Sequence, residues 1–309
     1  MLYTVSPIQR IFASTILAAV IIFSLSGCKT ASVPPASYLL TGNVHQQCLT
    51  ILREGVQGDE FWPSIHAAEA LIREDYAFEA TPLIEARMGS ERDRRRIAGY
   101  ARALALTDYN QGIVALQDIL LSDDLEARIL AAEAMFRTGL VGDPVILEQA
   151  TDPSNNGRLR VFAAAALTVT DRANMRDLVR EALGSNDPAA RYIAADVIPI
   201  IGSLEEDVPT LIDKKDLVNS DFENLYFVRA LAMFGLESAR KELLSFLKHP
   251  DPTIRSRAAF SIAEAWYVES SNQLIPLLKD PALAVRVRAA QALLTMANPN
   301  SAYRLLRSR

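Results

Sequence analysis

The sequence predicts an all-α fold: an α-α superhelix, or solenoid, of about eight stacked helix pairs. A pair of alanines, or of an alanine and another small or apolar residue, recurs eight times at the same place in a helical pattern. The pairs begin at Ala67, Ala98, Ala131, Ala163, Ala194, Ala230, Ala258 and Ala289. Successive pairs are 31, 33, 32, 31, 36, 28 and 31 residues apart. A nearly fixed period in this range is typical of stacked repeats. Half of the 309 residues are hydrophobic, which is enough for a large core.

Each copy is expected to hold a helix, a tight turn and a second helix. The last copy shows one buried helix face at Val285, Ala289, Leu293 and Met296. A turn at residues 298–300 then separates it from a second helix near the end of the chain. Asp-Pro pairs at Asp187, Asp251 and Asp280 predict helix starts, because Asp caps free amides and Pro fits the first turn.

The first 27 residues are expected to be a signal peptide. Arg10 is their only charge, and the apolar run Ile11–Leu25 is short for a membrane span. Residues 25–29 read Leu-Ser-Gly-Cys-Lys and resemble the lipobox of bacterial lipoproteins. This resemblance implies cleavage before Cys28 and lipidation of that cysteine with three acyl chains, enough for stable membrane anchoring. Lys29 is not the inner-membrane retention signal of that family, so a periplasm-facing position on the outer membrane is favoured. An ordinary signal peptide or an anchor helix is the alternative.

The mature chain divides into a tether and one repeat domain. Residues 28–42 hold the lipidated Cys28 and a short linker rich in Pro, Ser and Ala. Residues 43–57 are expected to form an unpaired capping helix, and the repeats cover about residues 60–309, so that 43–309 form one solenoid. Cys48 in the capping helix is interpreted as a buried apolar residue, with a redox role beside His45 as the alternative.

The repeats resemble HEAT-like repeats of a short bacterial kind, also found in phycobilin lyases and deoxyhypusine hydroxylases. The general HEAT period is about 40–47 residues, so the shorter spacing points to this armadillo-type subclass. The resemblance implies a right-handed superhelix in which the second helix of each pair lines the concave face. Arg304, Arg307 and Arg309 would lie on an uncapped last helix, an open end where a partner could stack.

An arginine three residues before the alanine pair recurs in six copies, at Arg95, Arg128, Arg160, Arg191, Arg255 and Arg286. We name these six the arginine ladder. One residue per repeat at one helical phase favours a structural role, in which each Arg binds an Asp at a neighbouring turn such as Asp187, Asp251 or Asp280. The alternative is that the stacked arginines bind an anionic ligand.

A second file of arginines precedes the alanine pair directly in three copies, at Arg229, Arg257 and Arg288. Residues 221–309 carry 12 Lys and Arg against 8 Asp and Glu, a net charge of +4 in a chain of net charge −5. This file, with Trp266, is a candidate partner-binding strip. The alternatives are a solvated helix face for the arginines and core filling for Trp266.

No catalytic, cofactor or metal site is predicted. The chain has three histidines, His45, His66 and His249, and none is followed by Glu, so the di-iron site of deoxyhypusine hydroxylases cannot be transferred. Their spacing also fits no zinc motif. His66 is interpreted as a packed or partly exposed helix residue. The net negative charge and the lipobox disfavour nucleic-acid binding.

The sequence therefore predicts a lipid-anchored scaffold that binds one or more unknown proteins in the cell envelope and is not an enzyme. The hypothesis of a different class is an enzyme or cofactor-binding HEAT-repeat protein related to deoxyhypusine hydroxylase or phycobilin lyase. The partner, the process and the oligomeric state do not follow from the sequence.

Overall fold

The computed structural model describes residues 40–298 except 108, 169, 171 and 173. Its helices are α1 (Gly42–Gln57), α2 (Phe61–Arg73), α3 (Ala77–Ser90), α4 (Arg94–Leu104), α5 (Tyr109–Leu120), α6 (Leu125–Thr138), α7 (Pro144–Ala150), α8 (Gly157–Thr168), α9 (Met175–Ala182), α10 (Pro188–Ile201), α11 (Leu204–Lys214), α12 (Asp221–Met233), α13 (Glu237–Ser245), α14 (Pro252–Glu264), α15 (Ser271–Leu274) and α16 (Leu283–Ala297). Short 3-10 turns are η3 (Lys215–Leu217), η4 (Phe246–Lys248), η5 (Val268–Ser270) and η6 (Ile275–Lys279). These residues contain no strand, and the predicted all-α repeat fold is confirmed.

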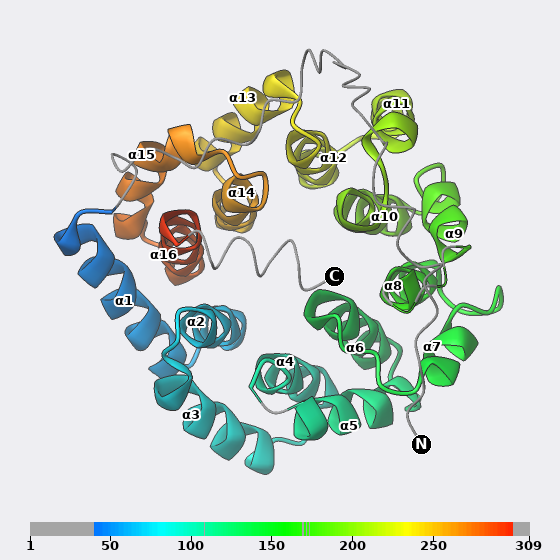
Figure 1. The fold of residues 1–309 in the computed structure, drawn as a ribbon, viewed down its shortest axis with the longest axis horizontal. Coiled ribbons are helices and arrows are strands. Elements are labelled where there is room, and N and C mark those ends of the chain that lie inside the picture. Colours follow the sequence, from blue (N-terminus) through cyan, green and yellow to red (C-terminus); the bar gives the residue numbers. More distant parts are fainter. Residues whose placement is uncertain (1–39, 108, 169, 171, 173, 299–309) are drawn as a thin grey trace, which may run out of the picture. The chain divides into compact units, whose positions relative to one another are not determined.

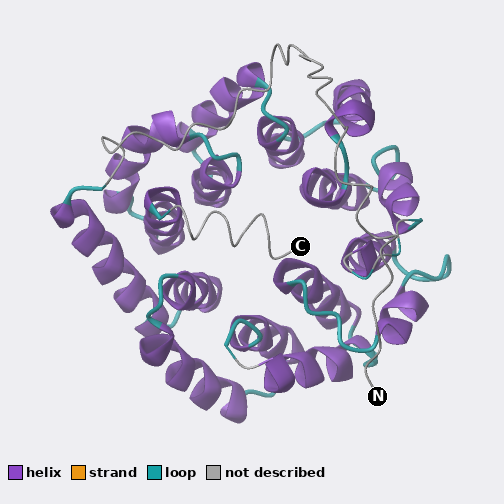
Figure 2. Ribbon diagram, in the orientation of Figure 1, coloured by secondary structure: helices purple, strands orange, loops and turns teal. Residues whose placement is uncertain are grey.

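The helices of the described residues belong to one compact unit and form two concentric layers (Figures 1 and 2). Even-numbered helices make the inner layer and odd-numbered helices the outer layer, so each repeat contributes one helix to each. Consecutive inner helices pack against each other from α2 to α16. The helices that carry the alanine pairs are the inner ones.

The two ends of the repeat array meet. Helix α16 packs against both α1 and α2, and α1 also packs against α2. Helix α1 thus occupies the outer position between two inner helices, as α3 does between α2 and α4. The expectation of an unpaired cap is therefore wrong, because α1 supplies the outer partner of α16, the last inner helix that the structure describes. The expected open end belongs to a later part of the chain. Arg304, Arg307 and Arg309 lie outside the described residues.

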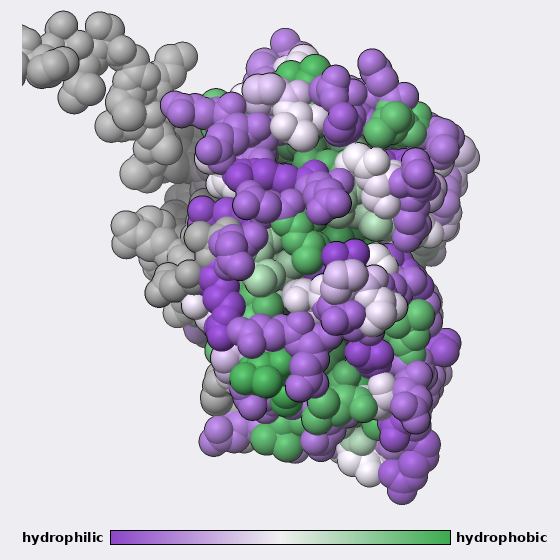
Figure 3. Space-filling view, turned by 90° about the vertical axis from the view of Figure 1, so that its right-hand side faces the viewer, coloured by the Kyte–Doolittle hydropathy of each residue, from purple (hydrophilic) through white to green (hydrophobic). Residues whose placement is uncertain are grey.

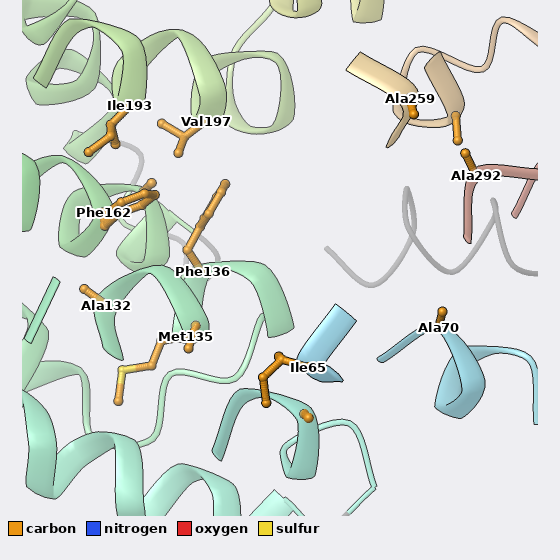
Figure 4. Packing of buried hydrophobic residues seen from close by; sticks show 14 of the residues in the cluster. Ile65, Ala70, Ala132, Met135, Phe136, Phe162, Ile193, Val197, Ala259 and Ala292 are labelled. Atoms are coloured by element: carbon orange, nitrogen blue, oxygen red, sulfur yellow. The ribbon is translucent and has the colours of Figure 1, made fainter. Parts of the chain in front are cut away.

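The inner layer consists of the first helices of the predicted pairs, not the second helices, so the expected concave face was wrong. The inner layer has the smaller circumference, and its helices must approach one another more closely than the outer ones. The alanines permit this approach: each of the eight that begin a pair is 0 or 1% exposed. Larger side chains such as Phe136, Phe162 and Val197 fill the remaining spaces between neighbouring inner helices (Figure 4).

Aspartates start several inner helices as predicted. The carboxylates of Asp187 and Asp251 accept hydrogen bonds from the amides of Ala189 and Thr253, at 2.9 and 2.7 Å. Asp280 accepts from the amide of Ala282 at 2.9 Å, but α16 begins only at Leu283 with Ala282 as its N-cap, so the helix start predicted at Asp280 is wrong. The caps at Asp187 and Asp251 each satisfy an amide that the helix itself leaves free.

The outer wall formed by α7, α9 and α11 is largely hydrophilic, with separate hydrophobic patches (Figure 3). Val145, Leu204 and Ile212 are among the exposed apolar side chains of these helices. Residues 1–27, Cys28 and most of the linker lie outside the described residues. None of the helices in the described part of the chain is long and apolar enough to cross a membrane.

Candidate functional site in the centre of the ring

The inner helices surround a cavity of about 610 Å³. Side chains from α2, α4, α6, α10, α12, α14 and α16 line it, so residues from both ends of the repeat array share one wall. The apolar part of the lining includes Trp62, Phe222, Tyr226, Met233 and Phe260. This volume falls within the range of about 300–1,000 Å³ that is usual for ligand sites.

A first charged cluster, which we name the Asp196 cluster, joins α6, α10, α12 and α14. Its members are Glu133, Arg137, Asp196, Arg229, Arg257 and Glu264. Asp196, only 3% exposed, binds the guanidiniums of Arg137, Arg229 and Arg257, the second at 3.0 Å. Arg229 also makes two hydrogen bonds to Glu264, at 2.7 and 2.8 Å. Three carboxylates therefore face three guanidiniums.

The charges of the Asp196 cluster stabilise one another. Burial by itself raises the pKa of Asp196 and of Glu264, but the surrounding guanidiniums outweigh it, and both pKa values lie below their ordinary range. Burial likewise lowers the pKa of Arg257, and the carboxylate of Asp196 more than offsets this, so the pKa is raised. Asp196, Glu264 and Arg257 are therefore ionised near neutral pH.

A second cluster, which we name the Glu69 cluster, joins α2, α4 and α16 across the closure of the ring. Its members are His66, Glu69, Arg73, Arg102 and Arg288. Glu69 accepts a hydrogen bond from Arg102 Nε at 2.6 Å. Arg288 donates to His66 Nε2 at 2.8 Å and to Gln291 Oε1 at 2.8 Å. Among the described residues, no carboxylate lies within ion-pair distance of Arg73 or Arg288.

His66 is a neutral imidazole in this cluster. A guanidinium can only donate, so the short contact with Arg288 requires an unprotonated Nε2. The proton is then on Nδ1, which lies 3.6 Å from Glu69 Oε2 and 3.4 Å from Arg102 Nη2. Burial, followed by the positive charge of Arg288, lowers the pKa of His66 to about 3. Burial, followed by the charge of Arg257, lowers the pKa of Arg288 to about 9.

The arginine ladder lies away from the cavity, and none of its six members lines it. Five of them donate to backbone carbonyls that shortly precede their own helix, either in the turn or at the end of the preceding helix: Arg128 to Leu120, Arg160 to Thr151, Arg191 to Ser185, Arg255 to His249 and Arg286 to Asp280. Three reach a carboxylate of the following repeat: Arg95 to Asp124, Arg191 to Glu223 and Arg255 to Asp280. Of the aspartates predicted as partners, Asp280 binds a ladder arginine, whereas Asp187 and Asp251 form no ion pair with one among the described residues. The contacts favour the structural interpretation over binding of an anion by this ladder.

The second file of arginines points inward, and the structure contradicts a solvated helix face. Arg229 is fully buried between Asp196 and Glu264, so it cannot contact a partner. Arg257 and Arg288 line the cavity. Trp266 is half-buried against the core, with a left-handed backbone (φ 50°), and does not line the cavity. The four residues of the predicted strip are therefore not one surface.

The surroundings of Cys48 and His249, the other residues considered from the sequence, favour structural roles. Cys48 is buried in the core, and burial raises the pKa of its thiol to about 12. His249 contacts Asp221 at 3.1 Å on the outside of the cavity. Among the described residues there is no group of three or more His, Cys, Asp and Glu side chains placed to hold a metal ion.

Sequence reasoning missed most of the cavity charges: Glu69, Arg73, Arg102, Glu133, Arg137, Asp196 and Glu264. A signal for six of them was present. Relative to the start of each alanine pair, the positions −1, +2 and +6 lie on one helix face, since they are spaced i, i+3 and i+7. These positions hold His66, Glu69 and Arg73 in the first repeat, and Leu130, Glu133 and Arg137 in the third. Polar residues at this phase of an alanine-rich helix mark the wall of the cavity.

Comparison with known proteins supports the repeat architecture. Residues 224–294 and 241–309 match the HEAT repeats family, which confirms HEAT repeats in the C-terminal part of the chain. Among curated proteins, none matches the sequence significantly. Human deoxyhypusine hydroxylase in complex with glycerol matches 82% of this chain and 97% of its own, at 18% identity and a TM-score of 0.41. Two engineered proteins match 82% and 83% of this chain, and 83% and 97% of their own, at 17% and 15% identity and TM-scores of 0.31 and 0.23.

Proposed function

We propose that the protein is a lipid-tethered, non-catalytic binding scaffold of the bacterial cell envelope, and that its partner engages the interior of the ring. The cavity of about 610 Å³ with its mixed aromatic and charged wall is the observation that carries this proposal. Such a space admits a short segment of a partner protein or a molecule of similar size. A folded domain would need a much larger contact surface.

The tether rests on the sequence Leu25–Lys29, with Cys28 as the lipidated residue and the outer membrane as the favoured location. Three acyl chains would keep the ring at the membrane and raise its local concentration toward envelope proteins. Replacing Cys28→Ser is expected to release the protein from the membrane fraction. Continued sedimentation of this variant with membranes would contradict the tether.

Site-specific photocrosslinking in intact cells tests where the partner binds. A benzophenone amino acid is placed either at Trp62, which lines the cavity and is 39% exposed, or at Phe78 on the outer helix α3, which is 74% exposed. Both sites are exposed aromatic positions, so each is a control for the other. We expect an adduct from position 62 and none from position 78. An adduct from position 78 alone would move the binding surface to the outer wall.

The absence of catalysis is part of the proposal. No histidine is followed by Glu, and the cavity histidine His66 is held neutral between Arg288 and Glu69. Stoichiometric iron or zinc in the purified protein would contradict this part and favour the enzyme hypothesis.

A further inference from the structure

The Glu69 cluster has an excess of positive charge. Arg73, Arg102 and Arg288 are guanidiniums, Glu69 is the only carboxylate of the cluster, and His66 is neutral, which leaves two positive charges unmatched. The other arginines of the cavity wall have carboxylate partners: Arg102 binds Glu69 and also lies 3.9 Å from Glu133 of the Asp196 cluster. Arg137 and Arg257 bind Asp196. The imbalance thus belongs to Arg73 and Arg288.

Of these two charges, that of Arg288 is poorly solvated and that of Arg73 is partly buried. Arg288 is only 9% exposed, and its guanidinium lies over the ring of Phe260 at 4.6 Å. An unmatched buried charge is costly, and proteins normally compensate it with an opposite charge. Burial lowers the pKa of both Arg73 and Arg288 and outweighs the attraction of the more distant carboxylates Glu69 and Glu264.

Several N–H donors at the cavity wall remain unused. A guanidinium carries five N–H groups, and Arg288 uses two nitrogens for His66 and Gln291. The side chain of Arg73 makes no hydrogen bond to the described residues. In addition, Nε of Arg257 is buried without a hydrogen-bond partner in this part of the chain. Guanidiniums with free donors match the two oxygens of a carboxylate or phosphate.

Aromatic side chains lie beside the unmatched charges. Trp62 stacks on His66 with ring centroids 6.1 Å apart, and Arg102 lies 5.8 Å from its ring. Trp62 nevertheless remains 39% exposed in the cavity. A small inorganic ion would leave this apolar surface uncovered, whereas a ligand with an apolar body would bury it.

We infer that the Glu69 cluster binds the oxyanion group of an amphipathic organic anion, with Arg73 and Arg288 as its counterions and with Trp62 and Phe260 against its apolar body. This inference rests on the proposed function, because it names the chemistry of the ligand that enters the ring. The oxyanion is supplied by a small organic acid or by the carboxyl terminus of a partner's chain.

Two fluorescent probes that differ in one charged group test the inference. 1-Anilinonaphthalene-8-sulfonate carries an oxyanion, and N-phenyl-1-naphthylamine is the same aromatic body without it. The Arg73→Gln/Arg288→Gln double variant is expected to bind the sulfonate at least about tenfold more weakly, equivalent to about 1.4 kcal/mol. Binding of the neutral probe should change less than twofold. The matched control is Arg94→Gln/Arg176→Gln, which removes the same charge from two exposed positions and should leave both affinities unchanged.

The outcomes separate this inference from the proposed function. If the Arg73→Gln/Arg288→Gln variant loses affinity for both probes equally, or for neither, the inference of an anion site is overturned. Ala284→Trp is designed to fill part of the cavity and should weaken both probes. If Ala284→Trp changes the affinity for neither probe, the cavity is not the binding site and the proposed function fails as well. If the double variant does not fold, Arg73→Gln alone tests the same point, and its affinity for the sulfonate probe is expected to fall severalfold.

Competition against the bound sulfonate identifies the source of the oxyanion. Benzoate and phenyl phosphate represent small acids, and N-acetyl-Ala-Phe with a free carboxyl group represents a chain terminus. Its carboxamide form is the control and should not compete. Displacement by either class supports the inference and names the source, while displacement by none of these oxyanions would contradict it.

Discussion

The two charged clusters of the cavity wall differ in their balance and in their place in the ring. The Asp196 cluster matches three carboxylates with three guanidiniums on helices α6 to α14, within the repeat array. The Glu69 cluster has one carboxylate for three guanidiniums and joins α2 and α4 to α16, across the closure. The balanced cluster is built to stabilise the fold, whereas the unbalanced one retains charge for a ligand. Four predictions test this contrast.

The largest loss of stability is expected when the charge balance of the Asp196 cluster is removed. Asp196→Asn leaves three buried guanidiniums around a neutral amide, and loss of one partner from a buried charge network typically costs about 3–5 kcal/mol. Urea denaturation should show a loss of stability of this size. Asp213→Asn, at an exposed residue paired with Lys214, is the control and should stay within about 0.5 kcal/mol. A loss below about 1 kcal/mol for Asp196→Asn would mean that the cluster contributes little to the fold.

Closure of the ring is tested at Gly55 on α1. A Cβ at this position would lie 2.9 Å from Val287 Cγ2 and 3.0 Å from Ala67 Cβ, on α16 and α2. Gly55→Val therefore overpacks the junction of the three helices and should cost about 2 kcal/mol. Hydrogen exchange should accelerate in α1 and α16 before α10 and α12, because stacked repeats contact only their neighbours.

The control for closure is Gly89→Val, since nothing lies within 4 Å of a Cβ at Gly89 on α3. Its stability should change by no more than about 0.5 kcal/mol. Equal effects at the two glycines would argue against a closed ring in solution.

The pH dependence of folding stability also distinguishes the two clusters. The pKa of His66 is about 3 in the folded protein, and about 6.5 is ordinary for an unfolded chain. Between these values the unfolded state binds a proton that the folded state does not, so stability falls as pH falls. The expected loss between pH 7 and 5.5 is about 1.3 kcal/mol. His66→Gln should remove this slope, and His45→Gln on α1 is the control that should keep it.

The carboxylates Glu69, Asp196 and Glu264 have lowered pKa values, so their stabilising contributions are lost only at more acidic pH. The change in stability between pH 7 and 5.5 therefore reports on His66 and not on these carboxylates. An unchanged slope in His66→Gln would mean that the Glu69 cluster does not hold this imidazole neutral.

The smallest effect is expected at Arg288. Arg288→Met removes a poorly solvated charge without a carboxylate partner, which favours the fold, but also removes the donor to His66 and Gln291. The two effects oppose each other, and the net change in stability is expected to stay within about 1 kcal/mol. Arg229→Met, in the balanced cluster, should instead lose about 3–5 kcal/mol because it leaves Glu264 and Asp196 without that partner. Thermal unfolding of the two variants compares them directly. A large destabilisation by Arg288→Met would show that this arginine serves the fold.

The sequence by itself determined the repeat, its helical content and the places where helices begin. The alanine pairs and the capping residues Asp187 and Asp251 act within one or two turns, so a local pattern is sufficient to predict them. The phase at positions −1, +2 and +6 also marked one helix face, although it did not tell which way that face is turned.

Only the tertiary structure decided that the array closes and that the alanine-bearing helices are inside. The curvature accumulates over eight repeats, and no local pattern records whether α1 reaches α16. Closure brings His66 within 2.8 Å of Arg288, 222 positions later in the chain. The same geometry buries Arg229, which in the sequence looks like any other surface arginine. Whether a charge meets solvent, a carboxylate or an open cavity depends on helices that lie far away along the chain.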